Sequence, residues 1–196
     1  MSLFVRHRKA KMPQLPVLGT ERLVLRAFDP SDAVDVYAYA QSERVGPMAG
    51  WAPHRSLEES RSVVRAFIEA GDAWAVVDKS SGHVIGSISL HLDGKRRLEG
   101  CRQMGYVLGE DHWGRGYATE ACRAVLQYAF ETLDAPVVSA MHFPANHKSR
   151  RILKKLGFTY EGTLRHTTLM YDGSYADSLV YSLLREEYAA QQPNVK

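Results

Sequence analysis

The stretch that decides the fold is GYVLGEDHWGRGYATEA, residues 105–121. Its start completes a β-prone run that predicts a strand over residues 102–108, and the apolar stripe that follows predicts a helix over residues 118–133. Two glycines around Arg115 let the connecting backbone turn tightly and let a bulky anion approach the main chain. The first amides of a helix have no internal partners and lie at the positive end of its dipole, so the junction is typical of a phosphate site. A plain strand-to-helix turn accounts for the same spacing equally well.

Similar signals divide the rest of the chain. Asp29-Pro30 predicts a helix start with proline in the first turn, and Ser56 with Glu59 forms a capping box that opens a second helix. Helical crossovers late in the chain require parallel neighbours, so we expect an α/β fold with a mixed sheet of about seven strands. The predicted strands cover residues 22–26, 74–77, 84–90, 102–108, 136–141, 158–161 and 179–184, and the predicted helices cover 30–42, 57–70, 118–133 and 146–156.

Composition narrows the functional classes. The 196 residues fit one domain, and no apolar run approaches the ~20 residues of a membrane span. A net charge of +3 is too weak to indicate direct nucleic-acid binding. Cys101 and Cys122 lack disulfide or metal spacing, so we expect inert thiols, no metal and a cytoplasmic protein. We expect a flexible basic arm over residues 1–18, one domain over 19–190 and a short tail over 191–196.

Four ordered segments resemble the GNAT superfamily of N-acetyltransferases, and the resemblance extends from Thr20 to Tyr188, over most of the chain. Gly116 and Ala118 match the last two positions of the acyl-CoA-binding motif (Q/R)-x-x-G-x-(G/A), and Trp113 stands where glutamine or arginine is usual. The form WGRGYATEA is similar to the branch that acetylates ribosomal protein N-termini (RimJ/RimL type). The other segments that resemble this branch are TERLVLR at 20–26, NHKSRRILKKLGF at 146–158, and the closing hairpin from Asp172 to Tyr188.

The resemblance implies a sheet that splays at the coenzyme A site and direct transfer of acetyl from acetyl-CoA to an amine, without a covalent enzyme intermediate. Main-chain groups of Tyr106, Val107 and Leu108 are expected to contact pantetheine as an added strand would. One of their amides would polarise the thioester carbonyl and hold the oxyanion. The pyrophosphate is expected on a second set of residues, which consists of Trp113, Gly114, Arg115, Gly116, Tyr117, Ala118 and the hydroxyl of Thr119. The indole of Trp113 has a second interpretation, as a core or interface aromatic.

The resemblance also assigns the next helix. Asn146 is a good N-cap, and capping alone accounts for it, but the matching asparagine of the family also binds the pantetheine arm. Ser149 lies one turn later, and we expect it near the sulfur as the proton donor to the leaving thiolate; a solvated serine is the alternative. Leu153 occupies the place of the tyrosine that many relatives use as this acid. The basic residues Lys148, Arg150 and Arg151 are expected either at the 3′-phosphate or on a solvated face.

The general base has no clear candidate. Related enzymes often carry a glutamate where this chain has Arg102-Gln103, and Glu99 upstream is expected to be a loop charge. A missing base favours an α-amino group, whose pKa is near 7.7–8, over a lysine near 10.4. We expect Trp51 and Tyr171 to wall the acceptor site. The histidines at 83, 91, 142 and 166 show no metal spacing, and we interpret them as ordinary surface or strand residues.

These observations favour an acetyltransferase that acts on a protein or peptide N-terminal amine, possessing no metal and binding no membrane. A small amine such as a polyamine, an amino acid or an antibiotic is the alternative acceptor. A non-catalytic acyl-CoA sensor is a second alternative, and an RNA-binding protein that uses the basic arm is a third. The sequence is compatible with a monomer and with a homodimer.

Overall fold

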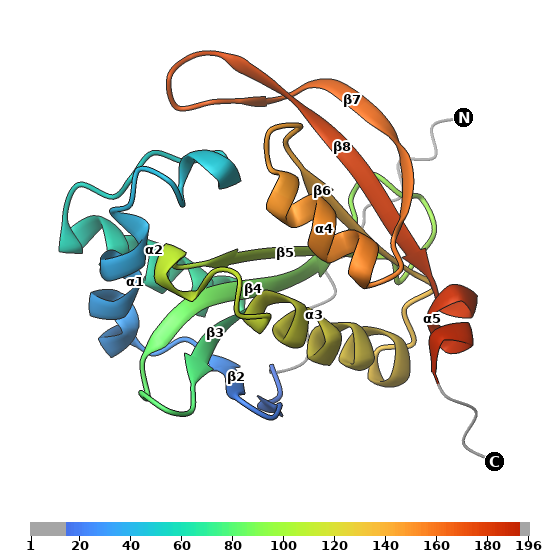
Figure 1. Ribbon diagram of the computed structural model, residues 1–196, viewed down its shortest axis with the longest axis horizontal. Coiled ribbons are helices and arrows are strands. Elements are labelled where there is room, and N and C mark those ends of the chain that lie inside the picture. Colours follow the sequence, from blue (N-terminus) through green and yellow to red (C-terminus); the bar gives the residue numbers. More distant parts are fainter. Residues whose placement is uncertain (1–14, 193–196) are drawn as a thin grey trace, which may run out of the picture.

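One sheet of eight strands runs through residues 15–192, the part of the chain that the computed structural model describes (Figure 1). The strand order is β1-β2-β3-β4-β5-β6-β8-β7, and every neighbouring pair is antiparallel except β5 and β6. The expected α/β fold with a mixed, mostly antiparallel sheet is confirmed. The strands are β1 (Leu18–Gly19), β2 (Leu23–Ala27), β3 (Ala73–Asp78), β4 (Val84–Leu92), β5 (Arg102–Leu108), β6 (Val137–His142), β7 (Thr159–Leu169) and β8 (Tyr175–Leu184).

Helices cover both faces of the sheet. Neighbouring residues of a strand point to opposite sides, and apolar residues on each side pack against a different set of helices. Trp74 of β3 belongs to a buried cluster with residues of α3 and α4, whereas Ala75 belongs to a second cluster with residues of α1 and α2. No helix within residues 15–192 is long and apolar enough to cross a membrane. The helices are α1 (Ala33–Ala40), α2 (Leu57–Ala70), α3 (Tyr117–Gln127, extended by a π-helical turn at Tyr128–Thr132), α4 (His147–Lys155) and α5 (Arg185–Gln191).

The chain ends differ from the sequence-based expectation. Leu15 and Leu18 pack against the core, and Pro16 accepts a 2.8 Å hydrogen bond from the indole of Trp74. The packed part of the chain therefore includes residues 15–18, which we had expected in an arm, and the short strand β1 raises the strand count from about seven to eight. Residues 1–14 and 193–196 lie outside the described residues.

The closing hairpin is longer than its apolar residues predict. β7 and β8 together span residues 159–184, whereas the apolar pattern predicted strands only over 158–161 and 179–184. Most side chains of β7 are exposed, so backbone pairing with β8 rather than burial extends this strand. Helix α5 follows β8 directly and was not predicted, because its seven residues carry little apolar periodicity.

The strands β5 and β6 separate at one end, and this leaves one edge of β5 without a neighbouring strand. Their parallel pairing covers only residues 102–104 of β5, which pair with residues 138–140 of β6. β5 continues to Leu108 and pairs there with β4 alone. Within the described residues, no strand pairs with the other edge of residues 105–108. The sheet therefore splays at this point, as the resemblance implied.

Glu120 ties the start of α3 to the start of β2. Its carboxylate accepts hydrogen bonds from the Thr20 hydroxyl (2.6 Å), from the backbone amide of Arg22 (2.8 Å) and from the Arg22 guanidinium (2.7 Å). Burial alone raises the pKa of Glu120, but the hydrogen bonds from Thr20 and Arg22 outweigh burial and lower it. The charged carboxylate thus contributes to folding.

We expect Glu120→Gln to lower the free energy of unfolding by about 2 kcal/mol at pH 7, because hydrogen bonds to a charged group are lost. A carboxyl whose pKa is lowered on folding stabilises the protein above its unfolded-state pKa of about 4.3, and this contribution disappears as the pH falls through the folded-state pKa. Urea denaturation at several pH values should therefore show the difference between wild type and variant shrinking in acid. Glu58→Gln is the control, since the ion pairs of Glu58 lie on the exposed face of α2 and should leave the melting temperature unchanged. A difference that stays constant from pH 7 to pH 3 would contradict the assignment.

Candidate active site

A cleft of about 1230 Å³ occupies the splay and reaches both faces of the sheet. β5 and the first turn of α3 form one wall, the start of α4 forms another, and the loop from Glu43 to Trp51 lies across them. Two of the predicted site residues, Arg115 and Tyr171, do not line it. The predicted residues that do line it are Trp51, Tyr106, Val107, Leu108, Trp113, Gly114, Gly116, Tyr117, Ala118, Thr119, Asn146 and Ser149.

The glycine-rich loop presents free backbone amides to the cleft. Gly114 and Gly116 have φ values of 78° and 84°, the left-handed region that only glycine adopts readily. Gly116 is also the N-cap of α3 and supplies no capping side chain. The first amides of the helix, from Tyr117 to Thr119, therefore face the cleft at the positive end of the dipole. This is the geometry of an anion site, and the Arg115 side chain lies outside it.

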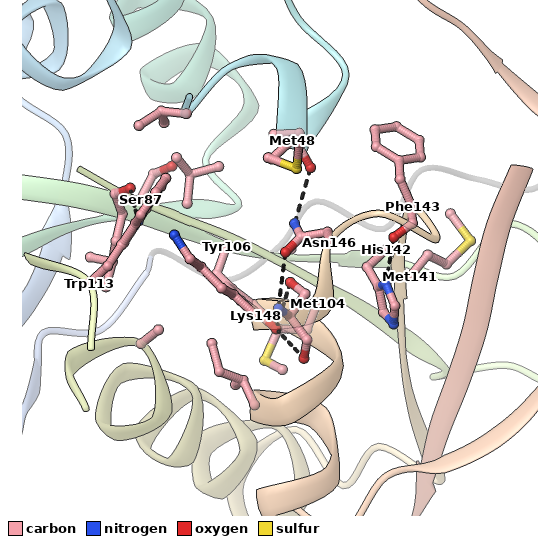
Figure 2. A pocket seen from close by; sticks show the side chains of 18 of the residues that line it. Met48, Ser87, Met104, Tyr106, Trp113, Met141, His142, Phe143, Asn146 and Lys148 are labelled. Carbon is pink, nitrogen blue, oxygen red and sulfur yellow. Dashed lines mark hydrogen bonds between the residues drawn. The ribbon is translucent and has the colours of Figure 1, made fainter. Parts of the chain in front are cut away.

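Trp113 joins this loop to the end of β5. Its indole N–H donates a 2.8 Å hydrogen bond to the carbonyl of Leu108, so this carbonyl is already occupied. The ammonium of Lys148 lies 3.2 Å from the centroid of the indole ring, and Figure 2 shows the two side chains next to each other. The Arg44 guanidinium carbon lies 5.5 Å from the same centroid. Burial lowers the pKa of Lys148, and the charges of Arg44 and Arg151 lower it further. Trp113 thus acts as an interface aromatic at the cationic mouth of the cleft.

Ser149 and Tyr106 form a hydroxyl pair below the open edge of β5. The Ser149 hydroxyl donates to the Tyr106 hydroxyl at 3.1 Å, and the Tyr106 hydroxyl lies 3.4 Å from the Ser149 carbonyl, to which it donates. Burial raises the pKa of Tyr106 well above its ordinary value, so the phenol stays protonated at neutral pH. The side-chain role of Tyr106 was missed from the sequence, because its partner lies 43 residues further along the chain.

Asn146 uses both ends of its amide. Its Oδ1 accepts a 3.0 Å hydrogen bond from the Ser149 amide and so caps α4, as predicted. Its Nδ2 donates to the carbonyl of Met48 at 3.2 Å and so holds the loop over the cleft (Figure 2). A contact between Asn146 and pantetheine stays a prediction.

The opposite face of the sheet carries the other half of the cleft. Gln103 and Val107 of β5 lie on the face turned away from α4, and Trp51 and Phe143 form part of the surrounding wall. Tyr171 is 53% exposed in the hairpin turn, and Thr168 of β7 lines the cleft instead. The hairpin therefore contributes Thr168 to the cleft wall, and not Tyr171 as expected.

Two of the four histidines interpreted as ordinary residues line this cleft, namely His91 and His142. His142 is buried, and its Nδ1 donates to the Phe143 carbonyl at 2.8 Å. Burial lowers the pKa of His142 despite this hydrogen bond, so its imidazole is neutral at pH 7. Glu99 is exposed and does not line the cleft.

The two buried cysteines are thiols held in their protonated form. Burial raises the pKa of Cys101 and of Cys122, which keeps both thiols protonated. Within residues 15–192 there is no group of three or more histidine, cysteine, aspartate or glutamate side chains placed to hold a metal ion.

Comparison with known proteins identifies the family of this chain. The family model described as "Acetyltransferase (GNAT) domain" matches residues 22–159. The chain is 30% identical to the uncharacterized N-acetyltransferase YoaA of Bacillus subtilis over 87% of this chain and 97% of that protein. It is 26% identical to the [ribosomal protein uS5]-alanine N-acetyltransferase of Escherichia coli over 87% of this chain and 92% of that enzyme. The crystal structure of a GNAT-family acetyltransferase from Bacillus anthracis covers 88% of this chain and 100% of its own, with a TM-score of 0.78 at 24% identity, and supports the fold.

The two hydrogen bonds of Asn146 are separable by substitution. We expect Asn146→Ala to lower the free energy of unfolding by about 1 kcal/mol, because α4 loses its cap. Asn146→Asp keeps a capping oxygen and loses only the donor to Met48, so its stability in urea denaturation should stay close to wild type. An equal loss in both variants would show that the bond to Met48, rather than the cap, carries the stability.

Proposed function

The chain belongs to the GNAT family of acetyltransferases, and on that premise we propose that it transfers acetyl from acetyl-CoA directly to the α-amino group of a protein or peptide N-terminus. The observation that carries this proposal is a single cleft that reaches both faces of the sheet, with an amide-lined anion pocket on one side and a largely uncharged groove on the other. The two cysteines of the chain are buried and form no disulfide, which favours a cytoplasmic location for the reaction.

The helix side of the cleft suits an acyl-CoA. The unpaired edge of residues 105–108 offers backbone groups to an extended, amide-containing arm, as a sheet edge does to an added strand. The amides from Tyr117 to Thr119 suit a pyrophosphate. Lys148 and Arg151 add positive charge at the mouth of the cleft. Acetyl-CoA supplies the activated thioester; the residues named here would bind and orient it.

The hydroxyl pair of Ser149 and Tyr106 supports a role for both residues at the leaving group. The open edge of β5 is where the thioester carbonyl would lie, and Tyr106, which belongs to this edge, holds the Ser149 hydroxyl at 3.1 Å. Ser149 donates the proton to the departing sulfur, and the protonated phenol of Tyr106 holds the serine hydroxyl in place. This arrangement takes the role of the tyrosine that Leu153 replaces.

The acceptor side favours an N-terminal amine. Among the described residues that line the cleft, Glu43 is the only one with a carboxylate, whereas a site for a polyamine needs several. The groove walls are instead apolar or neutral, with Met48, Trp51, Met141 and Phe143 among them. The uS5-alanine acetyltransferase relative acts, by its name, on a protein alanine. An α-amino group is also partly neutral at pH 7 and is ready to attack.

The test is release of free thiol from acetyl-CoA by the purified chain, with peptides that begin with Ala, Ser or Met as acceptors. We expect peptide-dependent release and blocked peptide N-termini by mass spectrometry. Ser149→Ala should lower kcat by at least tenfold, because the leaving thiolate loses its proton donor. Ser62→Ala, on the exposed part of α2, is the control and should keep the wild-type rate.

Polyamines, amino acids and aminoglycosides belong in the same panel. Release with one of these amines and with no peptide would refute the proposed acceptor. Tight coenzyme A binding without release for any acceptor would instead indicate an acyl-CoA sensor.

A further inference from the structure

His91 and Asp72 form a pair at the acceptor side of the cleft. The Nδ1 atom of His91 lies 2.7 Å from Oδ2 of Asp72. A carboxylate only accepts hydrogen bonds, so Nδ1 carries the hydrogen, and in the neutral imidazole Nε2 is then the atom with a free lone pair. The Asp72 side chain is only 22% exposed, and its backbone carbonyl accepts a 2.9 Å hydrogen bond from Leu90, the residue before His91. The imidazole is therefore held in one orientation.

The register of the sheet places this imidazole beside the position of the missing base. His91 of β4 pairs directly with Gln103 of β5, so both side chains lie on the same face, about 5 Å apart at Cβ. This is the face away from α4, from which the acceptor must approach. Both residues line the cleft, and the parting of β5 from β6 begins two residues beyond Gln103.

A row of polar side chains leads from His91 towards the open edge. Ser89 and Ser87 follow His91 at alternate positions of β4, so all three share one face, and all three line the cleft. Ser87 pairs with Val107, in the stretch where the thioester carbonyl is expected. Alternate positions of a strand lie about 7 Å apart, so the serine hydroxyls of the row can hold waters between the amine and the imidazole, and a proton can pass along them.

We propose that His91 is the general base of the acetyl transfer and that Asp72 is its positioning residue. The inference rests on the proposed function for its amine acceptor. The amine nitrogen forms a bond to the thioester carbonyl carbon, and the proton that the nitrogen loses passes to Nε2 of His91 through the waters of this row. The C–S bond then breaks with its electron pair on sulfur, and the thiolate takes the proton of Ser149 on the other face of the sheet. The proton on His91 leaves to solvent, from which Ser149 is reprotonated.

Three other histidines line the cleft. His112 lies in the turn before the glycine-rich loop and His147 is the first residue of α4, so both belong to the expected coenzyme A side. His142 does not fit the role of base either. His142 lies on the same face as Ala140, whose partner in β5 is Met104, and this is the face covered by α4. Its ring stacks on Tyr181, with the centroids 5.3 Å apart. His142 therefore faces the leaving-group side rather than the incoming amine.

The chain contains a matched control for the pair. His83 Nδ1 lies 3.0 Å from Oδ1 of Asp35, the same pairing at the other end of β4, and neither residue lines the cleft. We expect His91→Gln to lower kcat by about 100-fold, the size of effect expected for loss of a general base, with the acetyl-CoA KM unchanged. His83→Gln should keep the wild-type rate. Added imidazole should restore part of the activity of His91→Gly and should not affect Ser149→Ala.

Asp72 is tested by one substitution that keeps its size, Asp72→Asn, and one that keeps its charge, Asp72→Glu. Asp72→Asn should lower kcat several-fold without changing the peptide KM, because the imidazole loses its orientation, and Asp72→Glu should recover part of the rate. The proposal would be overturned if His91→Gln lowered kcat by less than tenfold, or if His83→Gln lowered kcat as much as His91→Gln does. A loss of activity in His91→Gly that imidazole does not rescue while coenzyme A still binds would also overturn it.

The test separates this inference from the proposed acceptor class. If small amines react and peptides do not, the proposed acceptor is wrong, and the same variants are compared on the amine that reacts. If no amine reacts, the slow hydrolysis of acetyl-CoA serves as the assay, since water then takes the place of the amine and needs the same proton acceptor. His91→Gln should slow that hydrolysis, and an unchanged rate would overturn the assignment of His91.

Discussion

Hydrogen bonding between β5 and β6 stops after Met104 and Ala140, and the arrangement of the site follows from this parting. A strand that continues without its neighbour leaves backbone groups unpaired, and such groups need water or a ligand as partner. The chain uses the edge of residues 105–108 in this way, in the middle of a sheet rather than at its rim. A ligand can therefore pair with β5 and still be reached from both faces.

The two faces of the parted sheet divide the chemistry. On the helix side, free amides of α3 and the cations at 148 and 151 favour an anionic ligand, and the half-buried hydroxyls of Tyr106 and Ser149 can supply a proton. On the opposite side, the half-exposed imidazole of His91 lies in the cleft wall, with the Asp72 carboxylate as its partner. The proposed proton donor for the leaving group and the proposed proton acceptor for the nucleophile thus lie on different faces and do not neutralise each other.

The contacts between distant segments hold the cleft in shape. Asn146 joins α4 to the loop at Met48, and Glu120 joins α3 to the start of β2. Trp113 joins the glycine loop to the last residue of β5. Each is a residue of the recognisable motifs or lies next to one, so part of their role is to support the site rather than to contact a ligand.

The sequence by itself determined the fold class, the glycine loop at the start of α3 and the cap at Asn146, because these depend on local propensity, on periodicity and on residues a few positions apart. Tertiary structure alone decided the pairs of Tyr106 with Ser149 and of His91 with Asp72, which lie 43 and 19 residues apart in the chain. Such pairs depend on sheet register and on how a helix packs over a strand, and a shift by one residue would turn each strand side chain to the other face. His91 therefore looked like an ordinary strand residue until the register placed it beside Gln103.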